Sequence, residues 1–127
     1  MAERARRKRR RLSRSGEFER VYREGRSHAS AYLVVYSFPR SGDGGPRLGI
    51  SVGRKLGGAV QRNRVKRCLR EAFWNRSGAL DEGYDFVIVA RPAAAELVER
   101  GGEPALAEAL AEVLGSAGLA PEEKRPG

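Results

Sequence analysis

The most densely charged part of the chain is the segment 54–71, which reads RKLGGAVQRNRVKRCLRE. Seven basic residues precede its first acid, Glu71: Arg54, Lys55, Arg62, Arg64, Lys66, Arg67 and Arg70. Cationic side chains at fixed spacing on a rigid helix suit a partner with regularly spaced negative charges, as in a nucleic acid. A solvated helix usually places opposite charges four residues apart. Lys66 and Arg70 instead repel each other, so the pattern favours a polyanion over an arginine-rich solvated surface.

Other reactive side chains give weaker signals. Asp81, Glu82 and Asp85 suggest a two-metal nuclease site, but they bracket one turn and no acids from other elements can be placed beside them. We therefore expect no catalytic residue and no metal ligand in this chain. Cys68 lies on the apolar side of the expected helix without a histidine to activate it, which indicates a core residue and not a nucleophile. One cysteine excludes an intramolecular disulfide, and a single histidine, His28, excludes a His-rich metal site.

The net charge of +9 is concentrated in two places. Residues 1–14 carry eight basic residues and one acid, and residues 54–70 carry seven basic residues and none, so the remainder is net acidic. Such focusing steers a protein toward a polyanion. Residues 1–14 have almost nothing to bury, so we expect a basic tail that is disordered until it binds.

The length of 127 residues predicts one domain, at 15–115, followed by a flexible tail at 116–127. No apolar run approaches the ~20 residues of a membrane span. The charged N-terminus lacks the apolar stretch of a secretory signal. We therefore expect a cytoplasmic protein. An arginine-rich organelle presequence is less favoured, because the basic residues run consecutively instead of following one helix face.

The remaining pattern predicts an α+β fold, a small sheet packed with helices in the order α-β-β-α-β-α. Ser15 caps the first helix and Gly25 ends it, with His28 in the loop beyond. The next five elements are expected at 31–38, 47–54, 59–75, 84–90 and 104–115, with 93–100 as a further short helical turn. The second strand has a face with little side chain, formed by Gly49, Ser51 and Gly53. Such a face indicates close packing, more commonly by the protein's own helix than by a ligand.

Three aromatic residues allow two interpretations. Phe18 and Tyr22 lie one turn apart on the first helix, and Tyr36 lies on the aromatic face of the first strand. Aromatic stripes at helical spacing are usually core, and the pattern alone favours that. Exposed rings would instead be stacking platforms for unpaired bases, worth about 1–3 kcal/mol each and indifferent to sequence.

The motif R-N-R-x-K-R-x-x-R-E at 62–71, with LGISVGRKLGGAV before it, strongly resembles the protein subunit of bacterial ribonuclease P. Residues 11–26 resemble the first helix of that family, and YLVVY and YDFVIVARP resemble its strands, so the resemblance spans about 11–92. It implies a compact ribonuclease P protein-like fold with a left-handed crossover, where the general expectation is right-handed. Gly53 and Gly58 depart from the family, which more often has serine and a polar residue there. The segment 93–103 is longer and richer in alanine than the family pattern leads us to expect.

The resemblance implies a protein that binds a large catalytic RNA, with which it removes the 5′ leader of precursor tRNA. The chemistry would lie in the RNA, with Mg²⁺ required by the holoenzyme and no cofactor bound by the chain itself. The partners would be that RNA and precursor tRNA, with no membrane or protein partner. The family's leader cleft maps onto Phe18, Tyr22 and Tyr36. Its RNA-binding positions map onto Arg54, Lys55, Arg62, Asn63, Arg64, Lys66, Arg67 and Arg70.

Two alternatives stay open at this point. A ribosomal or assembly RNA-binding protein without a processing role would show the same charge pattern, but its aromatic triad would be buried. A protein-only nuclease would cleave without an RNA partner and would depend on Asp81 or Asp85.

Overall fold

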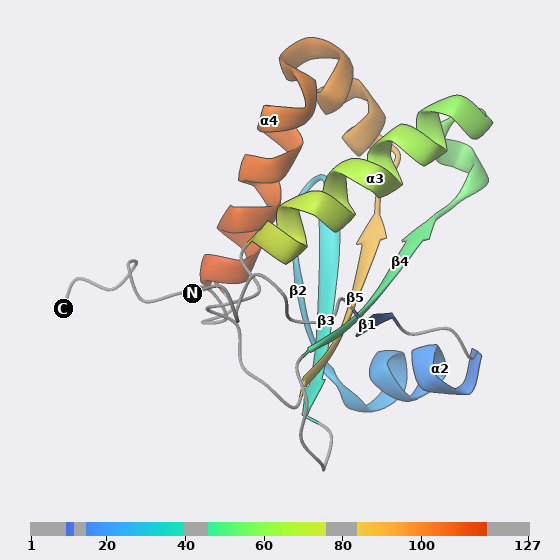
Figure 1. Cartoon of the computed structure of the whole chain (residues 1–127), viewed down its shortest axis with the longest axis vertical. Helices are drawn as coiled ribbons and strands as arrows, with labels where there is room; N and C mark the ends of the chain where they lie inside the picture. Colours follow the sequence, from blue (N-terminus) through green and yellow to red (C-terminus); the bar gives the residue numbers. More distant parts are fainter. Residues whose placement is uncertain (1–9, 12–14, 40–45, 76–83, 117–127) are drawn as a thin grey trace, which may run out of the picture.

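A single sheet lies between helices in the computed structural model, which describes residues 10–11, 15–39, 46–75 and 84–116 (Figure 1). Its five strands are ordered β1-β4-β5-β3-β2. They are β1 (Arg10–Arg11), β2 (Arg26–Ala29), β3 (Leu33–Pro39), β4 (Arg47–Val52) and β5 (Tyr84–Ala90). The helices are α2 (Ser15–Glu24), the 3₁₀ helix η1 (Arg54–Leu56), α3 (Ala59–Asn75) and α4 (Ala93–Ser116). The α+β class predicted from the sequence is confirmed.

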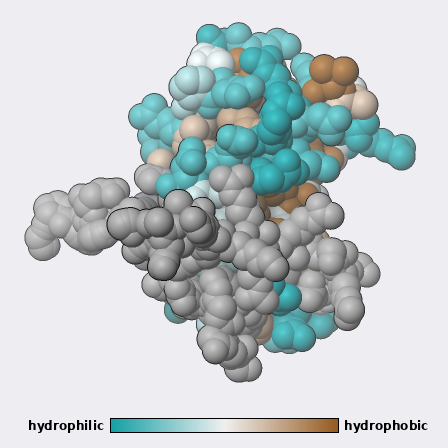
Figure 2. Space-filling model, viewed as in Figure 1, coloured by the Kyte–Doolittle hydropathy of each residue, from teal (hydrophilic) through white to brown (hydrophobic). Residues whose placement is uncertain are grey.

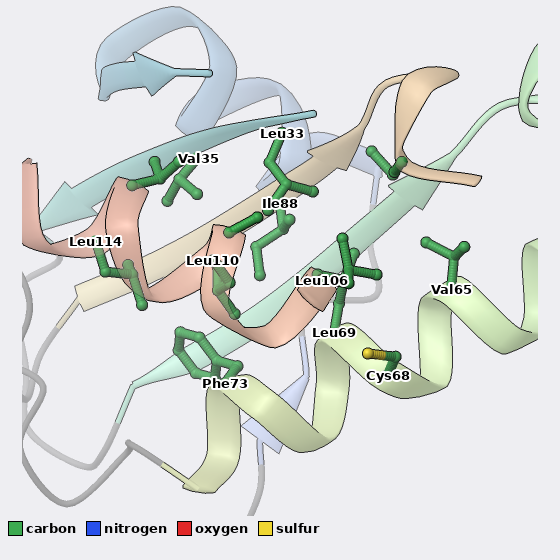
Figure 3. Close-up of a cluster of buried hydrophobic side chains, with 14 of the residues drawn as sticks. Leu33, Val35, Val65, Cys68, Leu69, Phe73, Ile88, Leu106, Leu110 and Leu114 are labelled. Carbon is green, nitrogen blue, oxygen red and sulfur yellow. The ribbon is translucent and has the colours of Figure 1, made fainter. Parts of the chain in front are cut away.

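The alternation of side chains along β3 divides the interior into two layers. Leu33 and Val35 point into the main core, where the sheet meets α3 and α4. Figure 3 shows this layer, in which Leu69 and Phe73 of α3 and Leu106, Leu110 and Leu114 of α4 share one cluster with Ile88 of β5. Tyr36 and Phe38 face the other side, where Val21 of α2 and Val87 are fully buried. The helices α3 and α4 therefore cover one face of the sheet, and α2 packs on the opposite face.

The strands β4 and β5 are parallel neighbours, and α3 is the crossover between them. The register places Arg47 opposite Asp85, and β3 pairs with the other side of β5 in the antiparallel sense. The left-handed sense of the crossover stays a prediction. Among the described residues, no helix combines the length and apolarity that crossing a bilayer requires.

Two edge strands depart from the sequence prediction. Arg10 and Arg11, expected in the basic tail, pair in parallel with Arg47 and Leu48 as β1. His28, expected in a loop, lies in β2 opposite Val35. Three of the four side chains of β2 are exposed, so the segment lacks the apolar alternation that reveals a strand. Both strands join the sheet through backbone pairing, and the pattern of side chains along a sequence does not reveal such pairing.

The last helix differs from the prediction in its extent. The short turn at 93–100 and the helix at 104–115 are both helical, but they join into α4 across a break at Gly102. Gly102 has φ 77° and ψ −177°, a conformation that is essentially restricted to glycine. Pro104 then opens the second half, as expected for a residue that lacks an N–H donor. The second strand also ends earlier than predicted, at Val52, because residues 54–56 turn into η1.

Candidate nucleic-acid interface

The bounds of α3, Ala59–Asn75, agree with the prediction. Of the five residues expected on its apolar arc, Val65, Cys68, Leu69 and Phe73 are buried and Ala72 is half-buried, and Trp74 is buried near the end of the helix. Asn63 and Arg67 are exposed on the opposite side. This amphipathic packing holds the basic side chains in fixed positions on the surface.

The basic residues of α3 divide between two flanks of the helix. Arg62, Lys66 and Arg70 follow each other at four-residue spacing and are all half-buried. Arg64 lies on the flank that faces α4, and its Nε is 3.4 Å from Oε2 of Glu103. Among the described residues, Arg64 is the one cation of α3 in an ion pair. The Arg62 Nε donates a hydrogen bond of 3.2 Å to the carbonyl of Gly57, which ties it to the loop before the helix.

The other two predicted cations precede α3 on the 3₁₀ helix. Arg54 and Lys55 are both exposed in η1, which leads through Gly57 and Gly58 into α3. Gly57 has φ 151°, which favours glycine. At Gly53 and Gly58, the two departures from the family, an added Cβ would meet nothing within 4 Å. The structure thus places all eight predicted RNA-binding residues on η1 and α3, with Arg64 on the flank of α3 that faces α4. Figure 2 shows a largely hydrophilic face over α3 and α4.

The aromatic triad lies on the other side of the sheet. The ring centroids of Phe18 and Tyr22 are 6.4 Å apart, and those of Tyr22 and Tyr36 are 4.9 Å apart. Tyr22 is 38% exposed, whereas Phe18 and Tyr36 are half-buried. The triad is therefore partly buried, and Tyr22 is its most exposed ring.

The bare face of β4 supports this triad. A Cβ at Gly49 would lie 2.5 Å from Cζ of Phe18, so the ring packs directly on the glycine backbone. The prediction that a helix of the protein covers this face is confirmed at Gly49 and Ser51, whereas Gly53 is exposed. Partial burial raises the pKa of the Tyr22 hydroxyl, and a hydrogen bond with Ser51 offsets part of that effect. Sequence reasoning missed Ser51 as a partner of Tyr22, as well as Arg20, whose guanidinium lies 5.8 Å from the ring centroid of Phe38.

Of the three acids considered for a nuclease site, the structure describes Asp85, which is held in an ion pair with Arg47. Asp85 is 2% exposed in β5 and accepts two hydrogen bonds from Arg47, at 2.9 and 2.8 Å. Its carboxylate is therefore engaged in holding two parallel strands together. Asp81 and Glu82 lie outside the described residues. No group of three metal-ligating side chains occurs within the part of the chain that the structure describes.

Cys68 and His28 occupy structural positions. Cys68 is buried, its thiol donates to the carbonyl oxygen of Glu103 at 3.5 Å, and burial raises its pKa. A thiol held in the protonated form is a poor nucleophile, which agrees with the predicted core role. His28 is half-buried in β2, and its Nδ1 has no hydrogen-bond partner among the described residues.

Known proteins share both the sequence pattern and the fold of this chain. Residues 7–114 match the family model described as Ribonuclease P. The chain belongs to this family. It is 40% identical over 90 residues to the ribonuclease P protein component of Bacillus cereus strain G9842, covering 71% of this chain and 78% of that protein. It is 45% identical over 87 residues to that of Halalkalibacterium halodurans, covering 68% of this chain and 73% of the relative.

Solved structures of ribonuclease P proteins share the fold. The Staphylococcus aureus protein superposes with a TM-score of 0.79 at 33% identity, covering 89% of this chain and 99% of that one. The Thermotoga maritima protein gives 0.74 at 36% identity, covering 84% and 96%. The predicted resemblance is thereby confirmed. As a ribonuclease P protein component, the chain has an RNA partner in a ribonucleoprotein and a role in tRNA processing.

Proposed function

We propose that this ribonuclease P protein binds the catalytic RNA through η1 and α3 and binds the 5′ leader of precursor tRNA at the aromatic triad. It thereby assists endonucleolytic removal of the leader, which gives the mature 5′ end. One observation carries the proposal: the cationic surface and the triad lie on opposite faces of one rigid sheet. Two separate surfaces suit two separate RNA elements, one structured and one single-stranded.

On the cationic surface, the chemistry is neutralisation and positioning. Each basic side chain that meets a phosphate releases counterions, which favours binding at low salt. Such contacts fix register and orientation but transfer no proton and break no bond. We therefore assign bond cleavage to the RNA, which would hold the Mg²⁺ that the holoenzyme requires. The protein's cations lower the Mg²⁺ concentration needed, because they replace part of the charge screening. We propose that this work takes place in the cytoplasm, which fits the bacterial origin of the relatives.

At the triad, the chemistry is stacking. A protein that accepts the leaders of many tRNA precursors cannot depend on base-edge hydrogen bonds, since leader sequences differ. Aromatic faces accept any base. The 38% exposure of Tyr22 supports a binding role, and it disfavours a ribosomal or assembly protein with a fully buried triad.

The buried ion pair of Asp85 with Arg47 likewise disfavours a protein-only nuclease, because a carboxylate with both oxygens engaged has little capacity left for a metal ion. We propose no catalytic residue and no metal ligand in this chain. Mg²⁺ is the cofactor of the holoenzyme.

The decisive experiment is precursor-tRNA cleavage at low Mg²⁺ in three parallel reactions: the protein alone, a bacterial ribonuclease P RNA alone, and both together. We expect cleavage at the mature 5′ end only in the combined reaction. Cleavage by the protein alone would contradict the assignment of chemistry to the RNA. If the RNA works at high Mg²⁺ but the protein gives no help at low Mg²⁺ despite binding RNA, the general RNA-binding alternative is correct.

A further inference from the structure

Glu103 is held beside the basic helix by three features of the chain. The break at Gly102, with φ 77°, separates Glu103 from the first half of α4, and Pro104 begins the second half. The thiol of Cys68 in α3 donates to the backbone carbonyl of Glu103. The side chain then reaches Arg64, with Nε and Oε2 3.4 Å apart. Because the backbone is fixed on both sides, the Glu103 carboxylate has a defined place next to the R-N-R segment.

The pair between Arg64 and Glu103 is unlike the other ion pair of the described residues. Both of its side chains are 46% exposed, whereas Asp85 and Arg47 are 3% and 20% exposed at their side chains. Exposed pairs contribute little to folding stability, since water and salt screen them. The packing of α3 on α4 rests on the buried apolar side chains and does not need this pair.

The charges around the pair have opposite signs on the two helices. α4 carries five glutamates and one arginine, whereas α3 carries five basic residues and one acid. Glu99 also reaches α3, where it accepts a hydrogen bond of 3.2 Å from Nε2 of Gln61. A carboxylate repels a phosphate within about 8 Å at physiological salt. The α4 side of α3 is therefore unfavourable for RNA, and the flank formed by Arg62, Lys66 and Arg70 is favourable.

We propose that Glu103 is an intramolecular competitor of RNA, which withholds Arg64 from phosphate and directs RNA to the opposite flank of α3. This inference rests on the proposed RNA-binding role of the same helix. While Arg64 is paired with Glu103, it neutralises no phosphate and so releases no counterion from the RNA. Removal of the carboxylate charge returns Arg64 to the RNA-binding surface and adds one cation to it.

The test is the substitution Glu103→Gln in the full chain, with Glu108→Gln as the matched control. Both remove one negative charge from α4, but Glu108 is exposed and has no ion pair with a described residue. Binding to a ribonuclease P RNA and to an unrelated duplex RNA is measured at a series of salt concentrations. Glu103→Gln should bind several-fold more tightly at low salt, and its salt slope should steepen by about 0.9. Between 50 and 200 mM salt, that change corresponds to an additional loss of about 3.5-fold.

A second pair of variants tests the role of Arg64 directly. In an Arg64→Ala background, Glu103→Gln should leave the salt slope unchanged. A steeper slope that persists without Arg64, or an equal effect of Glu108→Gln, would show that only net charge matters and would overturn the inference. An unchanged slope for Glu103→Gln in the wild-type background would also overturn it. If the proposed function is wrong, the unsubstituted protein would bind the ribonuclease P RNA and the unrelated duplex RNA equally. The comparison of Glu103→Gln with Glu108→Gln would still decide the role of Glu103.

Discussion

Tyr22 offers the sharpest test of the leader-binding surface, because it is the most exposed ring of the triad. Phe18 is a poorer choice, since its ring packs on Gly49 and its loss would loosen α2. Tyr22→Ala removes a side chain that is already 38% exposed, so the cost to folding should be small. A stacked base is worth about 1–3 kcal/mol, and a partly buried ring offers one face to it. We expect a loss of about 1–2 kcal/mol, which weakens binding about 5- to 30-fold.

The assay compares two RNAs that differ only in the leader. The holoenzyme with Tyr22→Ala should bind precursor tRNA more weakly, whereas its affinity for mature tRNA should stay within a factor of two. Tyr22→Phe is the matched control, since it keeps the ring and loses only the hydrogen bond with Ser51. It should behave like the unsubstituted protein. Equal losses for precursor and mature tRNA in Tyr22→Ala would refute the leader cleft, and the triad would then be a structural cluster.

Three further predictions concern the remaining surfaces. Lys66→Ala and Arg70→Ala should each weaken binding to the ribonuclease P RNA and reduce its salt slope by about 0.9, and an unchanged slope would argue against the α3 surface. Asp85→Asn should lower the free energy of unfolding by about 2–4 kcal/mol, measured in urea, because Arg47 would lose its charged partner. Cleavage by the holoenzyme below the melting temperature should persist. Loss of cleavage in a folded variant would instead support the protein-only nuclease. Deletion of residues 1–9 should reduce RNA affinity and leave the melting temperature within about 2 °C of that of the full chain, because the deletion preserves β1. A larger fall in melting temperature would mean that the tail packs on the domain.

The sequence predicted the elements with long, periodic patterns and missed those that depend on backbone pairing. The bounds of α3 agreed, because five apolar positions share one arc over seventeen residues. β5 agreed because it is a short apolar run in the centre of the sheet. β2 was missed, since an edge strand with exposed polar side chains has no alternation to detect. The two helical segments at 93–100 and 104–115 were predicted, but their junction at Gly102 was not, because its positive φ shows only in the backbone.

The sequence indicated which residues could form the candidate site, but it did not indicate how they are arranged in space. Periodicity on α3 predicted its apolar arc, but the half-burial of Lys66 and Arg70 and the division of the basic residues between two flanks depend on how the helix packs. The partner of Arg64 is Glu103, 39 positions along the chain, and a sequence pattern does not report such a contact. The exposure of Tyr22 likewise follows from the distance between α2 and β4, which no local pattern determines.

The strand β4 accounts for the fixed relation between the two proposed surfaces. On the face of β4 that meets α2, Gly49 lies against the ring of Phe18 and Ser51 is hydrogen-bonded to Tyr22. The carboxyl end of β4 continues directly into η1 and then α3, on the other side of the sheet. At its amino end, Arg47 is anchored to Asp85 of the neighbouring parallel strand. One anchored strand thus positions the triad and the cationic surface together. A leader bound at the triad would therefore lie at a set distance from the RNA bound at α3, as cleavage at a single position requires.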